Sequence, residues 1–463
     1  MNRSRRIGLL WLLLSSGVFI VWGSIMVRNS PGGLADFKAV YYGARCLLEH
    51  SDPYKQSEFL RVYQEEGGEL PSDPVMSRLF LCAVPVCINL PTALFLVAPF
   101  AFLAWGPAHL LWMFLIASCL TLAAILAWLL AERYESGVSL FLICIVLADS
   151  EIILAGGNSA GIAVSLCVVA VWCFLKQRFV FAGVLCMAVS LALKPHDAGL
   201  VWLFFLLAGG VYRKRALQTL AVVIALGLPA VLWVSYAAPN WTQELHSNLL
   251  EASARGSLND PGPASISFRS ADKIIDLQSV VSVFRDDPSI YNPASYLLCG
   301  ALLAVWSVST LRSRLTPARA LLALAAIAAF SMLPVYHRQH DAKLLLLTVP
   351  ACAMLWAEGG LTRWIALLLN TAGIVLTSDI PSASLVILTN NLHFGTVGML
   401  EQIRTVAVMG LAPIVLLALG IFYLWVNVRR AFPDTSEARV DRAPGWMQPH
   451  LQPATLSTSS LLE

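Results

Sequence analysis

The sequence predicts an all-α protein that crosses a membrane many times, with about 12–13 transmembrane helices and short helices at the outer membrane surface. Three observations predict this class. Of the 463 residues, 58% are hydrophobic and 13% are charged, whereas soluble domains contain roughly 45–50% and about 25%. The mean hydropathy is +0.71. Apolar segments close to the ~20 residues that a spanning helix needs recur along the chain.

Composition also excludes several classes of protein and site. The 31 Lys and Arg nearly balance the 28 Asp and Glu, and no dense basic stripe indicates a nucleic-acid partner. The ten cysteines show no CxxC or Cys/His spacing, so we expect no structural zinc site. The spacing of Asp36 and Asp149 does not indicate a metal site either, and we expect no cofactor. Cys82 and Cys87 could form a disulfide only if their side of the membrane is oxidising.

The first spanning segment is Ile7 to Val27, which follows Arg3, Arg5 and Arg6. It is too long for a cleaved signal peptide and lacks a small-residue cleavage site, so we expect a signal anchor with a cytoplasmic N-terminus. Several later segments are short for a bilayer, which indicates tilted or broken helices. The later candidate spans are 107–131, 138–155, 158–175, 179–193, 197–212, 216–236, 292–311, 318–335, 341–356, 363–380 and 404–427.

The positions of Lys and Arg predict the orientation. With these spans, the basic loops from Lys176 onward all fall on one side of the membrane. Basic loops are retained in the cytoplasm, so both termini are expected in the cytoplasm of a cell inner or plasma membrane. Segments 28–80, 237–291 and 381–403 and the turn 336–341 are then outside. The basic loops are 176–178, 213–215, 312–319, Arg363 and 429–430.

The segment 81–104 is apolar but contains Pro85, Pro91 and Pro99. If it crossed the membrane, every later basic loop would lie outside. Prolines break helices, so we favour a broken or re-entrant helix; the alternative is a true span that violates the positive-inside rule.

Four parts follow from this organisation. Residues 1–236 form an N-terminal transmembrane module that includes the outer loop 28–80, with amphipathic patterns at Phe37–Leu48 and Ser57–Glu65. Residues 237–291 form a second outer loop, and 292–430 hold the C-terminal helices. Residues 431–463 are rich in Pro, Ser and Thr, which predicts a disordered cytoplasmic tail.

Ionisable residues at membrane depth are costly, and here they gather on the outer side. Asp36 directly follows the first span. It is interpreted either as the N-cap of the helix 37–48 or as a carboxylate that acts as a general base.

Asp149 and Glu151 lie near the outer end of a span, before Gly156-Gly157-Asn158. The glycines would allow the backbone to approach a ligand closely. The alternative is an ordinary helix turn whose acids reach the membrane interface.

The segment Lys194-Pro195-His196-Asp197 separates two apolar runs on the outer side. Lys194 either snorkels to the lipid head groups or binds a phosphate as a point charge.

The turn Tyr336-His337-Arg338-Gln339-His340-Asp341 carries more chemistry than a connection between two helices needs. Its arginine is suited to bind phosphate, and His337 and His340 are spaced to share a helix face. The alternative is a solvated turn in which Asp341 caps the next helix.

Taken together, these motifs resemble the GT-C superfamily of membrane glycosyltransferases, most closely family 87, whose relatives include polyprenyl-phosphate-mannose-dependent mannosyltransferases. The likeness extends over roughly residues 30–357. One position departs from the family pattern, which has Gln where this chain has Gly157. The motifs are Asp36 with Tyr41-Tyr42, Asp52-Pro53-Tyr54, Asn89-Leu90-Pro91 through Pro99-Phe100, Gly156-Gly157-Asn158, Lys194-Pro195, and 336–341.

The resemblance implies a GT-C-like helical bundle that transfers mannose or a similar hexose, with inversion, from a polyprenyl-phosphate donor to a lipid or glycan acceptor at the outer face. It implies Asp36 as the base and His337 or His340 as the second catalytic residue, with no obligatory metal. The residues expected to bind the donor phosphate or substrate are Lys194, His196, Arg338, Asn158 and Asp341.

Two other classes compete with the enzyme. A lipid or solute transporter would place charges along several central helices and show internal symmetry, neither of which the sequence contains. A non-catalytic protein of envelope assembly would keep the same fold without turnover.

Overall fold

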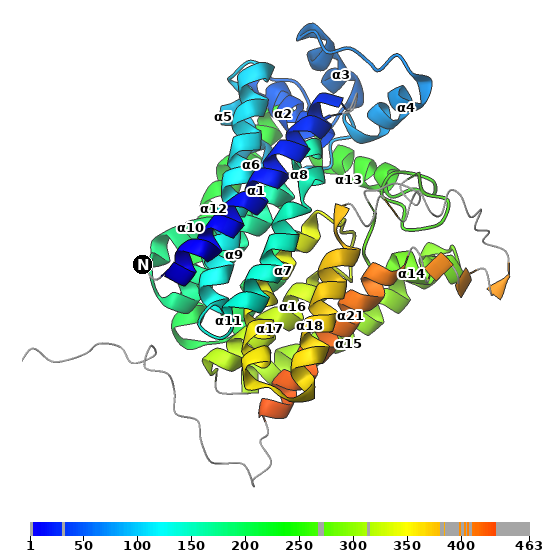
Figure 1. Ribbon diagram of the computed structural model, residues 1–463. Helices are drawn as coiled ribbons and strands as arrows, with labels where there is room; N and C mark the ends of the chain where they lie inside the picture. Colours follow the sequence, from blue (N-terminus) through cyan, green and yellow to red (C-terminus); the bar gives the residue numbers. More distant parts are fainter. Residues whose placement is uncertain are drawn as a thin grey trace, which may run out of the picture.

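The computed structural model describes residues 3–29, 33–266, 273–312, 315–379 and 410–431, with a few single positions between 380 and 410. The predicted tail 431–463 lies outside the described residues except for the end of the last helix, and so does most of 381–403. Within the described part the chain is all-α, as predicted, and its longest helices run side by side in a bundle (Figure 1).

Six segments of the bundle are long and apolar enough to cross a membrane. A helix rises about 1.5 Å per residue, so even the shortest of them, at 20 residues, matches a ~30 Å hydrocarbon core. The chain is therefore a multi-pass membrane protein. These segments are α1 (Arg3–Asn29), α6 (Trp105–Ala131), α7 (Ser136–Ala148) with α8 (Glu151–Gly156), α12 (Gly210–Ala237), α15 (Pro288–Arg312) and α21 (Leu411–Ala431).

Shorter apolar helices fill the centre of the bundle. Almost every residue of α9 (Ala160–Lys176) and all of α16 (Pro317–Ser331) from Arg319 onward are buried. An apolar helix that is buried on all faces is typical of a core position. The other short helices are α10 (Val180–Leu193), α11 (Pro195–Leu207), η1 (Asp341–Leu347, a 3-10 helix), α17 (Val349–Glu358) and α18 (Gly360–Leu376).

Several predicted spans are interrupted at the same polar residues that the sequence singled out. The span 138–155 breaks at Asp149-Ser150, and the span 341–356 begins as the 3-10 helix η1 before it continues as α17. The expectation of broken helices is confirmed at these positions.

The segment after α1, which is predicted to lie outside the membrane, folds into short helices within its described residues. The predicted helices 37–48 and 57–65 are present as α2 (Ala35–Leu48) and α3 (Gln56–Glu65). The segment 81–104 is broken into the end of α4 (Pro74–Ala83), a non-helical stretch and α5 (Pro91–Ala101). At about 1.5 Å per residue, neither helix is long enough to span alone, in agreement with the broken-helix interpretation. Cys82 and Cys87 are free thiols.

The segment 237–291, which is predicted to be a second outer loop, also forms helices within its described residues. It contains α13 (Trp241–Ala252) and α14 (Gln278–Phe284). Asn248 on α13 is buried and donates to the backbone oxygens of Tyr54 and Cys87 at 2.9 and 3.0 Å, which ties this loop to the first outer segment.

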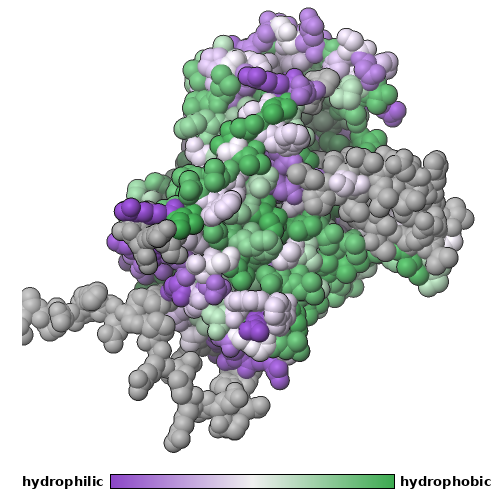
Figure 2. Space-filling view, viewed as in Figure 1, coloured by the Kyte–Doolittle hydropathy of each residue, from purple (hydrophilic) through white to green (hydrophobic). Residues whose placement is uncertain are grey.

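The surface separates into an apolar band and polar ends. Hydrophobic residues cover the sides of the helices, whereas hydrophilic residues gather over α3 and α4 and at the opposite end of the bundle (Figure 2). In the most hydrophobic 18-residue window of α12 only 11% of the residues are buried. Exposed apolar helices of this kind are suited to contact lipid.

Candidate functional site

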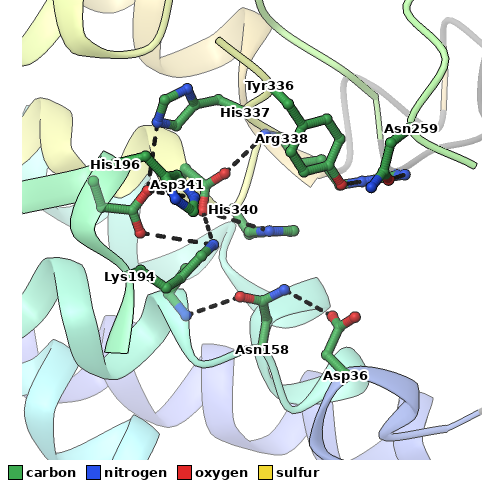
Figure 3. A network of polar contacts seen from close by, with 12 residues as sticks. Asp36, Asn158, Lys194, His196, Asn259, Tyr336, His337, Arg338, His340 and Asp341 are labelled. Carbon is green, nitrogen blue, oxygen red and sulfur yellow. Dashed lines mark hydrogen bonds and ion pairs between the residues drawn. The ribbon is translucent and has the colours of Figure 1, made fainter. Parts of the chain in front are cut away.

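The Asp36 carboxylate does not cap α2. The cap position is Leu34, whose φ of 61° is left-handed, and no side chain caps the helix. Asp36 is exposed in the first turn, and its Oδ2 accepts a hydrogen bond from Nδ2 of Asn158 at 2.8 Å (Figure 3). The N-cap interpretation is therefore wrong. The amide of Asn158 instead fixes the direction of an exposed carboxylate.

The glycine pair before Asn158 allows this contact. A Cβ on Gly156 would lie 2.9 Å from Oδ2 of Asp36, and a Cβ on Gly157 would lie 2.7 Å from Cβ of Phe37. Gly157 also has a φ of +64°, which disfavours other residues. The close approach predicted from these glycines is present, but the partner is α2 rather than a ligand.

Lys194 lies at the junction of α10 and α11, where Pro195 starts the second helix. Its Nζ is 2.6 Å from Oδ1 of Asp341 and 3.7 Å from Oδ2 of Asp197. Only 14% of the side chain is exposed. The snorkelling interpretation is wrong, because the ammonium points into the protein and pairs with two buried carboxylates.

The turn 336–341 is buried rather than solvated. His337 is 0% exposed and Asp341 1%. The backbone of 273–277 from the second outer loop runs beside the turn and covers it: Ile275 N donates to His337 O at 2.9 Å, and Gln339 N donates to Lys273 O at 3.2 Å. The interpretation as a solvated turn is therefore wrong.

Arg338 holds this turn to the outer loop. Its guanidinium donates to the hydroxyl of Tyr336 and, at 2.9 Å, to the backbone oxygen of Leu258. Its backbone N donates to Oδ2 of Asp341 at 2.8 Å. These contacts indicate a structural contribution from a residue that the sequence assigned to phosphate binding.

The histidines gather around two carboxylates. The rings of His196 and His337 lie 5.0 Å apart between centroids, and Nε2 of each is 3.5 Å from Oδ1 of Asp197. His340 is 3.5 Å from Oδ1 of Asp341. Burial lowers the pKa of His337, so its imidazole is neutral near pH 7.

Asp197 is the member of this group to which the sequence gave no role. Its spacing from Lys194 places both at the first turn of α11, and helical residues three apart share a face. This three-residue spacing is the feature of the sequence that could have identified Asp197.

A second cluster lies on the same side of the bundle. Carboxylate oxygens of Asp149, Glu151 and Asp379 are all within 4.8 Å of one another. Asp379, which the sequence did not single out, accepts from Ile152 N at 2.8 Å and from Nε2 of Gln339 at 3.2 Å. Lys343 Nζ donates to the backbone oxygen of Asp149 at 2.9 Å.

The predicted residues thus form two neighbouring groups (Figure 3). The first is the Asp36–Asn158 pair, and the second contains Lys194, His196, His337, His340 and Asp341. Within the described residues, the Asp36 carboxylate accepts its hydrogen bond from Asn158 and not from His196, His337 or His340.

The architecture and site define a multi-pass helical membrane protein with a polar cluster at the ends of its helices. Comparison with family models, with curated proteins and with solved structures finds no match to this chain.

Proposed function

We propose that the protein is an integral-membrane glycosyltransferase that moves a hexose from a polyprenyl-phosphate donor to a lipid or glycan acceptor at the outer face. The observation that carries the proposal is that two groups lie near each other in an apolar bundle. One is the exposed Asp36 carboxylate, which Asn158 orients, and the other is the cationic and imidazole-rich cluster around Lys194. The resemblance to family 87 supplies the substrate class.

The proposed reaction needs a base beside the acceptor. The acceptor hydroxyl oxygen attacks the anomeric carbon of the donor sugar and forms the new C–O bond. Asp36 takes the hydroxyl proton, and Asn158 keeps its carboxylate in one direction. Because attack occurs opposite the leaving group, the configuration at the anomeric carbon inverts.

The reaction also needs partners for the leaving group. The bond between the anomeric carbon and the phosphate oxygen breaks with its electron pair on the phosphate, which gains negative charge. Hydrogen-bond donors and cations that await this charge stabilise the transition state. Lys194 and His340 are the proposed partners. The apolar band on the sides of the helices is suited to the polyprenyl chain.

The test is transfer from defined donors. The full-length protein, in membranes of cells that lack other polyprenyl-phosphate-dependent transferases, is incubated with radiolabelled polyprenyl-phosphate mannose or glucose. The proposal expects label to leave the donor and to appear in a new lipid or glycan product. If no product forms but labelled lipid or solute crosses vesicles that contain the purified protein, the transporter alternative is supported instead.

A further inference from the structure

Four polar atoms close to Lys194 make no hydrogen bond to the described residues, and Nε2 of both His196 and His337 faces Oδ1 of Asp197. Within the described chain, Nε2 of His196, Nε2 of His337 and both carboxylate oxygens of Asp197 have no hydrogen-bond partner. Asp197 is 1% and His337 0% exposed. Buried polar atoms are nearly always paired, because an unpaired one costs free energy. This group therefore calls for a ligand.

The tautomer of His337 determines what kind of ligand fits. Its Nδ1 lies 2.8 Å from the backbone oxygen of Val335. A carbonyl oxygen can only accept, so we assign the ring hydrogen to Nδ1. Nε2 then directs a lone pair toward the Asp197 oxygen 3.5 Å away. Two electron-rich atoms in this position repel each other unless a proton or a metal cation lies between them, and 3.5 Å is long for a hydrogen bond through a proton. Metal-binding histidines are commonly oriented by such a backbone hydrogen bond.

The distances suit a small transition-metal ion. Zinc binds histidine nitrogen and carboxylate oxygen at about 2.0–2.2 Å, so tetrahedral ligands lie roughly 3.4 Å apart. Here each histidine Nε2 lies 3.5 Å from the shared Asp197 oxygen, and all three ligand atoms are within 4.8 Å of one another. We propose that His196, Asp197 and His337 bind a divalent cation of the zinc class.

The ligand set leaves one position open. Three protein ligands with a fourth place for water or substrate are typical of reactive zinc sites. The His196 side chain is 35% exposed, whereas its Nε2 and the other proposed ligand atoms are buried.

The acidic cluster of Asp149, Glu151 and Asp379 is the competing place for an ion. Ile152 N and Gln339 Nε2 donate to Asp379, whereas Oε2 of Glu151 has no hydrogen-bond partner within the described chain. Carboxylate oxygens alone also favour harder ions such as Mg²⁺ or Ca²⁺. The two imidazoles therefore assign a zinc-class ion to the first group.

The net charge around Lys194 indicates a role for the ion, and this role rests on the proposed function. Lys194 contacts two carboxylates, those of Asp197 and Asp341, so this set has a net charge of −1 and would repel a phosphate. A divalent cation changes that charge to +1. The open position would then attract the donor phosphate.

The experiment measures metal binding directly. The full-length protein is purified in detergent through a tag without histidine, stripped with chelator, and titrated with ZnCl₂ and, separately, with CoCl₂, whose visible absorption reports nitrogen and oxygen ligands. We expect one bound Zn²⁺ per chain. His337→Ala and Asp197→Asn should each weaken binding by at least ~100-fold, more than the loss of a supporting residue causes.

His340→Ala is the matched control, because it removes a neighbouring imidazole from the same turn but no proposed ligand; it should bind Zn²⁺ like the wild type. The proposal is overturned if the wild type binds no Zn²⁺ at micromolar concentration, or if His337→Ala binds as well as His340→Ala. Loss of binding in Glu151→Gln alone would move the ion to the acidic cluster and also overturn it. Because metal content is read without a transfer assay, a negative result here leaves the proposed function standing.

Discussion

Lys194 shows how single charges organise the candidate site. Its ammonium is paired at 2.6 Å with Asp341, a carboxylate that is 1% exposed. Removing one member of a buried ion pair leaves the other charge without compensation and destabilises a protein by roughly 3–5 kcal/mol. A loss of activity in a Lys194 variant would therefore mix a structural effect with a functional one.

The variant Lys194→Ala should weaken donor use by about 1.5–3 kcal/mol if the ammonium contacts the donor phosphate, the range for hydrogen bonds to charged groups. Donor dependence of transfer and thermal unfolding in detergent are measured together. The double variant Lys194→Ala/Asp341→Asn removes the nearer of the two carboxylates that Lys194 contacts, so it should recover part of the stability but not donor use. Normal donor use in the stable double variant would contradict a role for Lys194 in phosphate binding.

The sequence singled out the charged residues of the candidate site but did not predict their contacts. Asp36, Lys194 and the turn 336–341 are charged where a membrane protein avoids charge, and that cost is visible without a structure. Their partners could not be predicted from the sequence, because the ion pair of Lys194 with Asp341 joins residues 147 positions apart. Asp379 was not predicted for the same reason, because its contact with Ile152 joins residues 227 positions apart.

At the scale of elements, the contact between α2 and the α8–α9 connection sets the geometry of Asp36. Leu34 N donates to the backbone oxygen of Ala155 at 2.7 Å, directly before the glycine pair. The absence of a Cβ at Gly157 lets Phe37 pack against this backbone. The direction of the carboxylate thus depends on two chain segments that approach each other within van der Waals contact.

Gly157→Ala should reduce transfer strongly, because the new Cβ meets Phe37 and pushes α2 away from Asn158. Gly67→Ala provides the control for backbone strain: Gly67 has a φ of +81°, and nothing lies within 4 Å of an added Cβ. Each substitution places a side chain in the left-handed region, at a cost of about 1–2 kcal/mol. Transfer rates and unfolding temperatures of the two variants are compared, and equal transfer rates would contradict a role for this contact.

Element boundaries followed the sequence where periodicity and prolines were informative, as in α2, α3 and the break before α5. The sequence did not predict that 273–277 would cover the turn 336–341. Main-chain pairing of this kind depends on backbone atoms that every residue carries, so no side-chain pattern predicts it. The segment 237–291 was predicted only as an outer loop, whereas its backbone contacts bury part of it.

At the scale of the whole molecule, basic residues and the candidate site occupy opposite helix ends. Lys176 is at the C-terminal end of α9, whereas Asn158 precedes its N-terminus. Arg319 is in the first turn of α16, and the turn 336–341 follows its C-terminus. Arg430 near the end of α21 pairs with Glu358 at the end of α17. With the positive-inside rule, this polarity favours a cytoplasmic basic end and an outer site.

Accessibility of single introduced cysteines tests that orientation in intact cells. Lys214 and Arg255 are both exposed, the first in a basic segment and the second in the outer loop. We expect Arg255→Cys to react with a membrane-impermeant maleimide and Lys214→Cys to react only after the membrane is opened, each measured above the labelling of the parent chain. The reverse pattern would place the candidate site in the cytoplasm.

The central claim is that the Asp36 carboxylate accepts the proton of the acceptor hydroxyl. The most direct measurement is transfer by Asp36→Asn beside binding of the same donor, followed by retention of a fluorescent polyprenyl-phosphate sugar. An Asn side chain can still accept the hydrogen bond from Asn158, and Asp36 does not cap α2, so folding and donor binding should persist. General bases contribute about 10²–10⁴-fold to rate, and we expect transfer to fall by that factor. Asp73→Asn, which changes the N-cap of α4 in the same outer segment to another good cap, should transfer normally. Undiminished transfer by Asp36→Asn would contradict the account.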